Sequence, residues 1–165
     1  MNDLPELFQS RRSIRRYESR PVPQAIIDRL LESAVWAPSA HNRQPWRFVV
    51  ITTANAKHKL AGAMGEALRR DLAADGLSRT AIDRDANRSY TRLTGAPLLI
   101  LVCLTMADMD EYPDERRNRN EALMAAQGAA MAGQNLMLSA HALGLGACWL
   151  CAPLFCPEIV REALD

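Results

Sequence analysis

The sequence predicts one α/β or α+β domain built around a central sheet. Short apolar segments rich in β-branched residues alternate along the chain with longer stretches whose apolar residues recur every three to four positions. The chain has 165 residues, 48% of them hydrophobic, which is enough for one core but not for two independent domains. We therefore expect a single domain over residues 1–165.

Three short segments are apolar without alternation, as is typical of strands covered on both faces of a sheet. These segments are Phe48–Thr52, Leu98–Leu104 and Leu145–Leu150. Because three strands make a narrow sheet, we expect another surface to cover it, and a second subunit is the simplest candidate.

Helical periodicity separates the predicted strands. Between Val22 and Val35 the apolar residues recur every three to four positions, and Pro38 ends this helix. A helix from about Asn120 to Leu143 is rich in Ala, Gly and Met and apolar on nearly all sides, so helices, a sheet or a second subunit must cover it. Further helices are expected over residues 3–10, 55–72, 78–94 and 157–164, and a polar loop over 105–117.

Net charge and the distribution of apolar residues argue against nucleic-acid binding and membrane insertion. A formal net charge of +1 lacks the excess of cations that non-specific binding to nucleic acid or to a membrane surface needs. An Arg-rich nucleic-acid binder is therefore a weak alternative. The first twenty residues have no apolar stretch typical of a signal peptide, and no later run suits a membrane span. We expect a soluble, cytoplasmic protein.

A cationic segment, Arg11–Tyr17, follows the first predicted helix. If this segment is extended, Arg11, Ser13 and Arg15 face one side, and two guanidiniums beside a hydroxyl suit a phosphate monoester. Arg12 and Arg16 then face the other way. If the segment is helical, its arginines share a face and are simply solvated.

A second polar stretch, Ala37–Trp46, lies on a loop bracketed by Pro38 and Pro45. Its Ser39, Asn42 and Gln44 could bind a ribityl chain and the polar edge of an isoalloxazine ring. Loops of this composition also occur as plain surface turns.

Metal and nucleophilic chemistry have weaker support. Cys148 and Cys151 are followed by Cys156, but no second pair or nearby His completes a zinc set, so we expect no metal and interpret these residues as buried thiols. His41 could contact a substrate or could be an ordinary loop histidine. No Gly-x-Gly-x-x-Gly motif follows a strand, so any nicotinamide must dock transiently.

The two polar stretches together resemble the FMN-dependent nitroreductase superfamily. The shared features are Arg-Arg-Ser-x-Arg near the start and, some 25 residues later, a Pro-Ser-x-x-Asn-x-Gln-Pro-Trp loop leading into an apolar strand. Within the superfamily, residues 37–48 and 144–157 are similar to the flavin domain of the deazaflavin-coenzyme biosynthesis protein, here without its ligase domain. The resemblance runs from about Leu4 to Leu164.

The resemblance implies an α+β fold with a central mixed sheet flanked by helices, a long Ala-rich dimerisation helix and FMN at the interface of a homodimer. Arg11 and Arg15 would bind FMN, Ser13 its phosphate or ribityl region, and the 38–42 loop the flavin of the other subunit. Residues 147–150 would pass the isoalloxazine face. The implied cofactor-binding set is Arg11, Arg12, Ser13, Arg15, Pro38, Ser39, Ala40, Asn42, Gln44, Cys148, Trp149 and Leu150, with His41 as a substrate contact.

The implied activity is two-electron, ping-pong transfer from a reduced nicotinamide or similar donor to a quinone, nitroaromatic or other electrophilic acceptor. The flavin carries the chemistry, so no catalytic side chain is expected. The alternative is a non-catalytic FMN-binding or storage module, or a partner-dependent flavin domain. Members of the family usually continue into a further strand and an arm that embraces the partner. Because this sequence ends at Asp165, we expect both to be missing.

Overall fold

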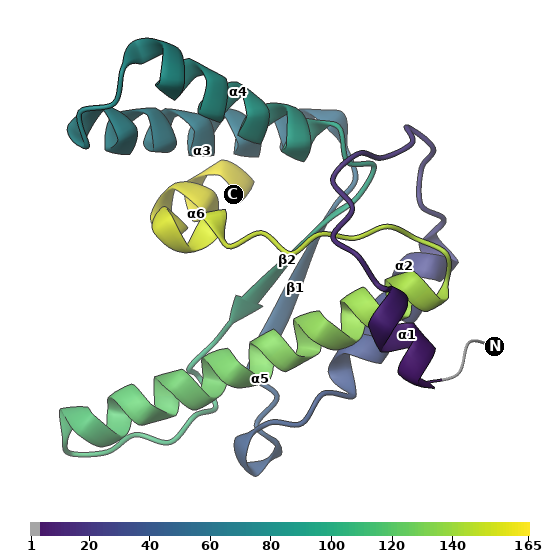
Figure 1. The fold of residues 1–165 in the computed structure, drawn as a ribbon. Helices are drawn as coiled ribbons and strands as arrows, with labels where there is room; N and C mark the ends of the chain where they lie inside the picture. Colours follow the sequence, from purple (N-terminus) through teal and green to yellow (C-terminus); the bar gives the residue numbers. More distant parts are fainter. Residues whose placement is uncertain (1–3) are drawn as a thin grey trace. The chain divides into compact units, whose positions relative to one another are not determined.

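Helices and a small sheet make up the computed structural model, which describes residues 4–165 (Figure 1). The start predicted for the first helix, residue 3, lies outside the described residues. The elements in chain order are α1 (Leu4–Ser10), α2 (Gln24–Val35), η1 (Ala40–Asn42), β1 (Trp46–Ile51), α3 (Ala54–Ala74), α4 (Arg79–Thr94), β2 (Leu99–Leu104), α5 (Glu115–Ala142), η2 (Ala152–Phe155) and α6 (Pro157–Leu164).

The chain divides into two compact units. The first holds the described residues up to Ile14 together with residues 22–50 and 100–149. The second holds residues 15–21, 51–99 and 150–165. Both contain helices, and the strand pair belongs to the first except for one terminal residue of each strand. That residues 1–165 form one flavin-binding domain stays a prediction.

The core of the first unit lies where α2 and α5 meet the start of β1. Small residues dominate it, so the helices approach closely and Trp46 fills the remaining space, with only 4% of its surface exposed. Its buried members are Ala34, Ala37, Trp46, Ala129 and Ala132, and the half-buried Phe48, Val102 and Leu136 pack against them. This core supports the loop that leads into β1.

The two strands of the sheet run antiparallel. The backbone N–H of Thr105, just after β2, donates to the carbonyl of Pro45, just before β1, at 2.8 Å. Such a bond joins the end of one strand to the start of the other, which only antiparallel strands allow. The sequence predicted both strands to within two residues.

The predicted third strand, Leu145–Leu150, is wrong. Ala147 forms an isolated parallel bridge with Ser13, and no named strand lies in this segment. The apolar residues of this segment pack against a helix and do not form a strand of the sheet, since the Trp149 indole lies against Gly133 of α5. The sheet among the described residues therefore has two strands and is narrower than expected.

The second unit is built on α3, which packs against both α4 and α6 (Figure 1). Side-chain oxygens of Thr53 and Ser78 cap α3 and α4 by accepting backbone N–H groups. The ammonium group of the buried Lys57 donates a hydrogen bond to the carbonyl of Ala96 at 2.8 Å. This bond ties α3 to the chain entering β2.

The long helix α5 starts earlier than the apolar pattern indicated, at Glu115 and not near Asn120. Asp114 causes the early start, because its carboxylate accepts the backbone N–H of Arg117 at 3.0 Å. The predicted polar loop over 105–117 is correspondingly shorter. None of the helices described between residues 4 and 165 has the length and apolar character needed to cross a membrane.

Candidate functional site

The cationic segment after α1 is extended, as one of the two sequence readings expected. Ser13 and Ala147 form a parallel bridge, and the backbone N–H of Ile14 donates to the carbonyl of Ala147 at 3.0 Å. Gly146 makes this approach possible, because a Cβ there would lie 2.8 Å from the Cβ of Ile14. The segment is thus fixed against the chain that follows α5.

The neighbours Arg11 and Arg12 have different surroundings. The Arg12 guanidinium donates to the carbonyls of Gln9 at 2.6 Å and of Arg11 at 2.9 Å, so it satisfies carbonyls at the end of α1. The half-buried Arg11 side chain has no ion pair or hydrogen bond to any residue in the described part of the chain. Of the two, Arg11 is available to an anion, and the cofactor role of Arg12 stays a prediction without support from its contacts.

The loop from Pro38 to Pro45 has an unusual backbone. His41, Asn42 and Gln44 have φ values of 49°, 54° and 50°, in the left-handed region that non-glycine residues seldom adopt. Strain of this kind costs about 1–3 kcal/mol per residue and clusters at binding sites. Three such residues in one loop indicate that the loop must keep one particular backbone conformation, as a binding site requires.

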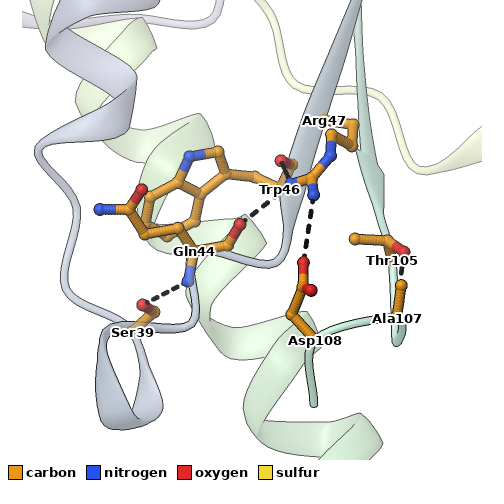
Figure 2. Close-up of polar contacts among 7 residues, drawn as sticks. All are labelled: Ser39, Gln44, Trp46, Arg47, Thr105, Ala107 and Asp108. Atoms are coloured by element: carbon orange, nitrogen blue, oxygen red, sulfur yellow. Dashed lines mark hydrogen bonds and ion pairs between the residues drawn. The ribbon is translucent and has the colours of Figure 1, made fainter.

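Internal hydrogen bonds hold this geometry (Figure 2). The backbone N–H of Gln44 donates to the Ser39 hydroxyl at 2.9 Å, as Figure 2 shows. The Gln44 side-chain amide also donates to Asn42 Oδ1 at 3.2 Å. These polar groups therefore stabilise the conformation of the loop. Asn42 and Gln44 are also exposed, so their remaining hydrogen-bonding atoms face solvent. His41 is exposed too, and no hydrogen bond to its ring is found among the described residues.

Two arginines that the sequence analysis did not select anchor the loop. Arg47 donates to the carbonyls of Gln44 at 3.1 Å and Trp46 at 2.8 Å and pairs with Asp108 at 3.5 Å (Figure 2). Arg43 pairs with Asp110 at 2.6 Å. The acidic residues come from the segment after β2, which the sequence predicts only as a polar loop. The acidic residues of this segment, opposite in charge to Arg43 of the loop and to Arg47 just after it, are the sequence signal for these ion pairs.

A buried carboxylate completes this support. Glu121 of α5 is 1% exposed, and its Oε1 accepts the backbone N–H of Asp110 at 3.3 Å. On the same helix, a Cβ at Gly128 would lie 3.5 Å from Ser39 and Pro45, so the loop rests directly on α5. The helix that the sequence assigned to a dimer interface also carries this loop.

The segment after α5 lies against the same helix. A Cβ on Gly133 would overlap the Trp149 ring, so the indole occupies the space that the glycine leaves. The half-buried Cys148 thiol donates to the Trp149 carbonyl at 3.5 Å. Arg15 and Leu150 belong to the second unit, and their assignment to the cofactor stays a prediction.

The cysteines do not gather with other potential metal ligands in the part of the chain that the structure describes. No group of three or more His, Cys, Asp or Glu side chains within the described residues could hold a metal ion. Cys156 is buried, and burial followed by the nearby charges of Asp71 and Glu158 raises the pKa of its thiol. Cys151 is exposed, contrary to the expectation of a buried thiol.

Comparison with known proteins identifies the family. The model of the nitroreductase family matches residues 8–165, nearly the whole chain. The chain belongs to the nitroreductase family. This confirms the superfamily recognised in the two polar stretches and the α+β fold expected from it.

Three similar proteins illustrate the likeness. A 5,6-dimethylbenzimidazole synthase of Rhodospirillum rubrum is 30% identical over 171 residues, which cover 98% of this chain and 74% of that protein. A protein of Methanothermobacter thermautotrophicus, provisionally named NADH dehydrogenase/NAD(P)H nitroreductase, is 29% identical over 89% of this chain, which spans 60% of that protein. A provisionally named nitroreductase of Desulfovibrio desulfuricans, crystallised with FMN, is 29% identical to this chain, with a TM-score of 0.71. The match covers 100% of this chain and 78% of the Desulfovibrio chain.

These similar proteins refine the earlier resemblance. The likeness to the synthase places a 5,6-dimethylbenzimidazole synthase among the proteins related to this chain. The likeness to the flavin domain of the deazaflavin-coenzyme protein stays a prediction.

Proposed function

We propose that this chain binds FMN and acts as an FMN-dependent oxidoreductase. The observation that carries the proposal is the pairing of an available guanidinium, Arg11, with a strained and internally bonded loop, His41–Gln44, in one unit of a nitroreductase fold. The FMN-bound Desulfovibrio relative, 29% identical, supports the cofactor. When bound, FMN would supply the hydride-accepting and hydride-donating ring.

The residues present suit the phosphate end of FMN. A phosphate monoester needs charge-assisted donors, and Arg11 offers a fork of N–H groups that no carboxylate of the described chain occupies. Ser13 stands two residues further on the same extended segment. We assign Arg11 and Ser13 to the phosphate, while Arg12 acts on the end of α1.

The 38–45 loop suits the polar part of the flavin. Its backbone is already fixed by Ser39, Arg43 and Arg47, so binding would order few further groups. Asn42 and Gln44 would address the ribityl chain or the ring edge. His41, exposed at the tip of η1, would face the substrate.

We further propose a homodimer in which the 38–42 loop of one subunit contacts the flavin of the other. The support is the exposure of large apolar side chains in the first unit, where Trp36 is 80% exposed and Leu123 of α5 is 56% exposed. In this arrangement the donor and the acceptor use the same site in turn. The donor would be a reduced nicotinamide and the acceptor a quinone, nitroaromatic or other electrophile.

The test compares Arg11→Ala with two other variants of the same segment. Arg11→Ala should lose most of its bound FMN, measured by the visible spectrum of the purified protein and mass analysis of the released cofactor. Arg16→Ala should retain FMN, because Arg16 is not among the residues assigned to the cofactor. Arg12→Ala should retain FMN affinity but unfold more easily.

A colourless wild-type protein that takes up no added FMN would refute the proposal. Steady-state oxidation of NADH or NADPH with a quinone or nitroaromatic acceptor tests the enzymatic part. FMN binding without turnover would favour the alternative, a non-catalytic flavin module.

A further inference from the structure

A hydrogen bond joins the ends of two helices that are far apart in sequence. Ser10, the last residue of α1, contacts His141, in the last turn of α5, with 2.8 Å between Oγ and Nε2. The Ser10 hydroxyl donates its one hydrogen to the carbonyl of Glu6 at 2.6 Å. His141 must therefore be the donor in this contact, through Nε2–H.

The position of the His141 ring is itself defined. Its backbone carbonyl accepts the N–H of Gly144 at 3.0 Å, where the chain leaves α5 with a φ of 76° at that glycine. Such a left-handed residue ends a helix in a fixed way. The imidazole therefore projects from a rigid helix end, in contrast to a mobile loop.

This contact immediately precedes Arg11. Three residues after Arg11, the backbone N–H of Ile14 donates a hydrogen bond to the carbonyl of Ala147 at 3.0 Å. The segment Arg11–Ser13 is thus held at both ends by one short stretch of chain, residues 141–147. Loss of either attachment would free the side chains between them.

We propose that His141 is a positioning residue for the phosphate end of the flavin site. By holding Ser10, its Nε2–H sets the direction in which Arg11 and Ser13 leave α1. The inference rests on the proposed function, since it requires that these two residues meet the FMN phosphate. A purely structural role for the same bond would affect FMN and riboflavin binding equally, whereas a role at the phosphate would affect FMN alone.

The experiment measures the affinity of the full-length apoprotein for FMN and for riboflavin by quenching of flavin fluorescence. In His141→Ala, we expect the Kd for FMN to rise about tenfold, the effect of one lost hydrogen bond that orders a charged group. The Kd for riboflavin should stay unchanged. His141→Gln, which keeps an N–H donor, should restore most of the FMN affinity.

Two further variants sharpen the test. Ser10→Ala should match His141→Ala, and the double variant should be no worse than either single one, since both remove the same bond. His58→Ala is the matched control, because its ring bonds the Tyr90 hydroxyl at 2.8 Å within the second unit. It should leave both Kd values unchanged.

The inference fails if His141→Ala leaves the ratio of the two Kd values at the wild-type value, whether both ligands weaken or neither does. Ser10→Ala decides the same question if His141→Ala does not fold. Failure of the proposed function looks different, because the wild-type protein would then bind neither FMN nor riboflavin.

Discussion

Trp149 and Gly133 show how one small residue positions a large one. The indole ring occupies the space above the glycine, where an added Cβ would overlap the ring. We predict that Gly133→Ala displaces the ring and lowers the free energy of unfolding by about 1–3 kcal/mol relative to Gly128→Ala. Urea denaturation at neutral pH measures this difference.

Gly128→Ala is the matched control on the same helix. Its added Cβ would meet Ser39 and Pro45 at 3.5 Å, an ordinary contact, so the better helix propensity of alanine should stabilise by up to about 1 kcal/mol. Equal stability of the two variants would contradict the prediction. So would near-UV circular dichroism of Gly133→Ala that matches the wild-type protein, because a displaced indole must change that signal.

Residue types in the 38–45 loop were readable from the sequence, but their geometry was not. The sequence predicts Ser39, Asn42 and Gln44 as donors and acceptors for a ligand, and the structure shows that they bond one another. Left-handed backbone at His41 and Gln44 leaves no mark in composition. Arg12 was selected because it carries charge, while its position beside the end of α1 gives it another task.

At the scale of an element, the start of α5 depends on one side chain. Asp114 Oδ1 accepts the backbone N–H of Arg117, and Oδ2 pairs with the Arg117 guanidinium. The side-chain hydrogen bond to Arg117, followed by the backbone one, lowers the pKa of Asp114. Together these bonds explain why the helix begins five residues before its apolar pattern does.

We predict that Asp114→Ala shortens α5 at its start and lowers stability at neutral pH. Asp114→Asn should retain part of that stability, because an amide oxygen still caps the helix. The carboxylate's contribution is present above the pKa that Asp114 has in the unfolded chain. It is lost as the pH falls through the lower pKa of the folded state.

The two variants and the wild-type protein should therefore differ least in strong acid. Chemical unfolding followed by far-UV circular dichroism, at neutral pH and at a series of acidic values, measures this convergence. A constant difference between wild type and Asp114→Asn across the series would show that the charge of Asp114 contributes nothing.

The bounds of the helices and strands were easier to predict from the sequence than the contacts that each segment makes. The helices α2, α3, α4 and α6 and the strands β1 and β2 all lie within two residues of their predicted bounds, because apolar periodicity and caps act locally. The apolar run Leu145–Leu150 carried the same signal as a strand, but its role depends on Gly133 and Ser13, which are distant in sequence. Pairing between distant segments is what a local pattern cannot report.

At the scale of the whole molecule, one face of α5 is exposed although it carries little charge. Its exposed central residues recur at intervals of four, as neighbours on one helix face do. They are Ala122, Leu123, Ala126, Gln127, Ala130, Met131 and Gln134. A helix face of this composition favours contact with another chain, and the proposed homodimer offers a second copy of this one.

We predict that Leu123→Asp converts a dimer into a monomer and weakens FMN binding with it, because a buried unpaired carboxylate opposes association and the proposed flavin site needs both subunits. Light scattering during size-exclusion chromatography measures the mass, and flavin fluorescence gives the affinity. Leu77→Asp is the control, since Leu77 is a 39% exposed leucine of the second unit, at the turn between α3 and α4. A wild-type protein that is monomeric yet binds FMN would overturn the shared-site arrangement while leaving the cofactor proposal intact. A dimeric Leu123→Asp variant would place the interface elsewhere than on this face of α5.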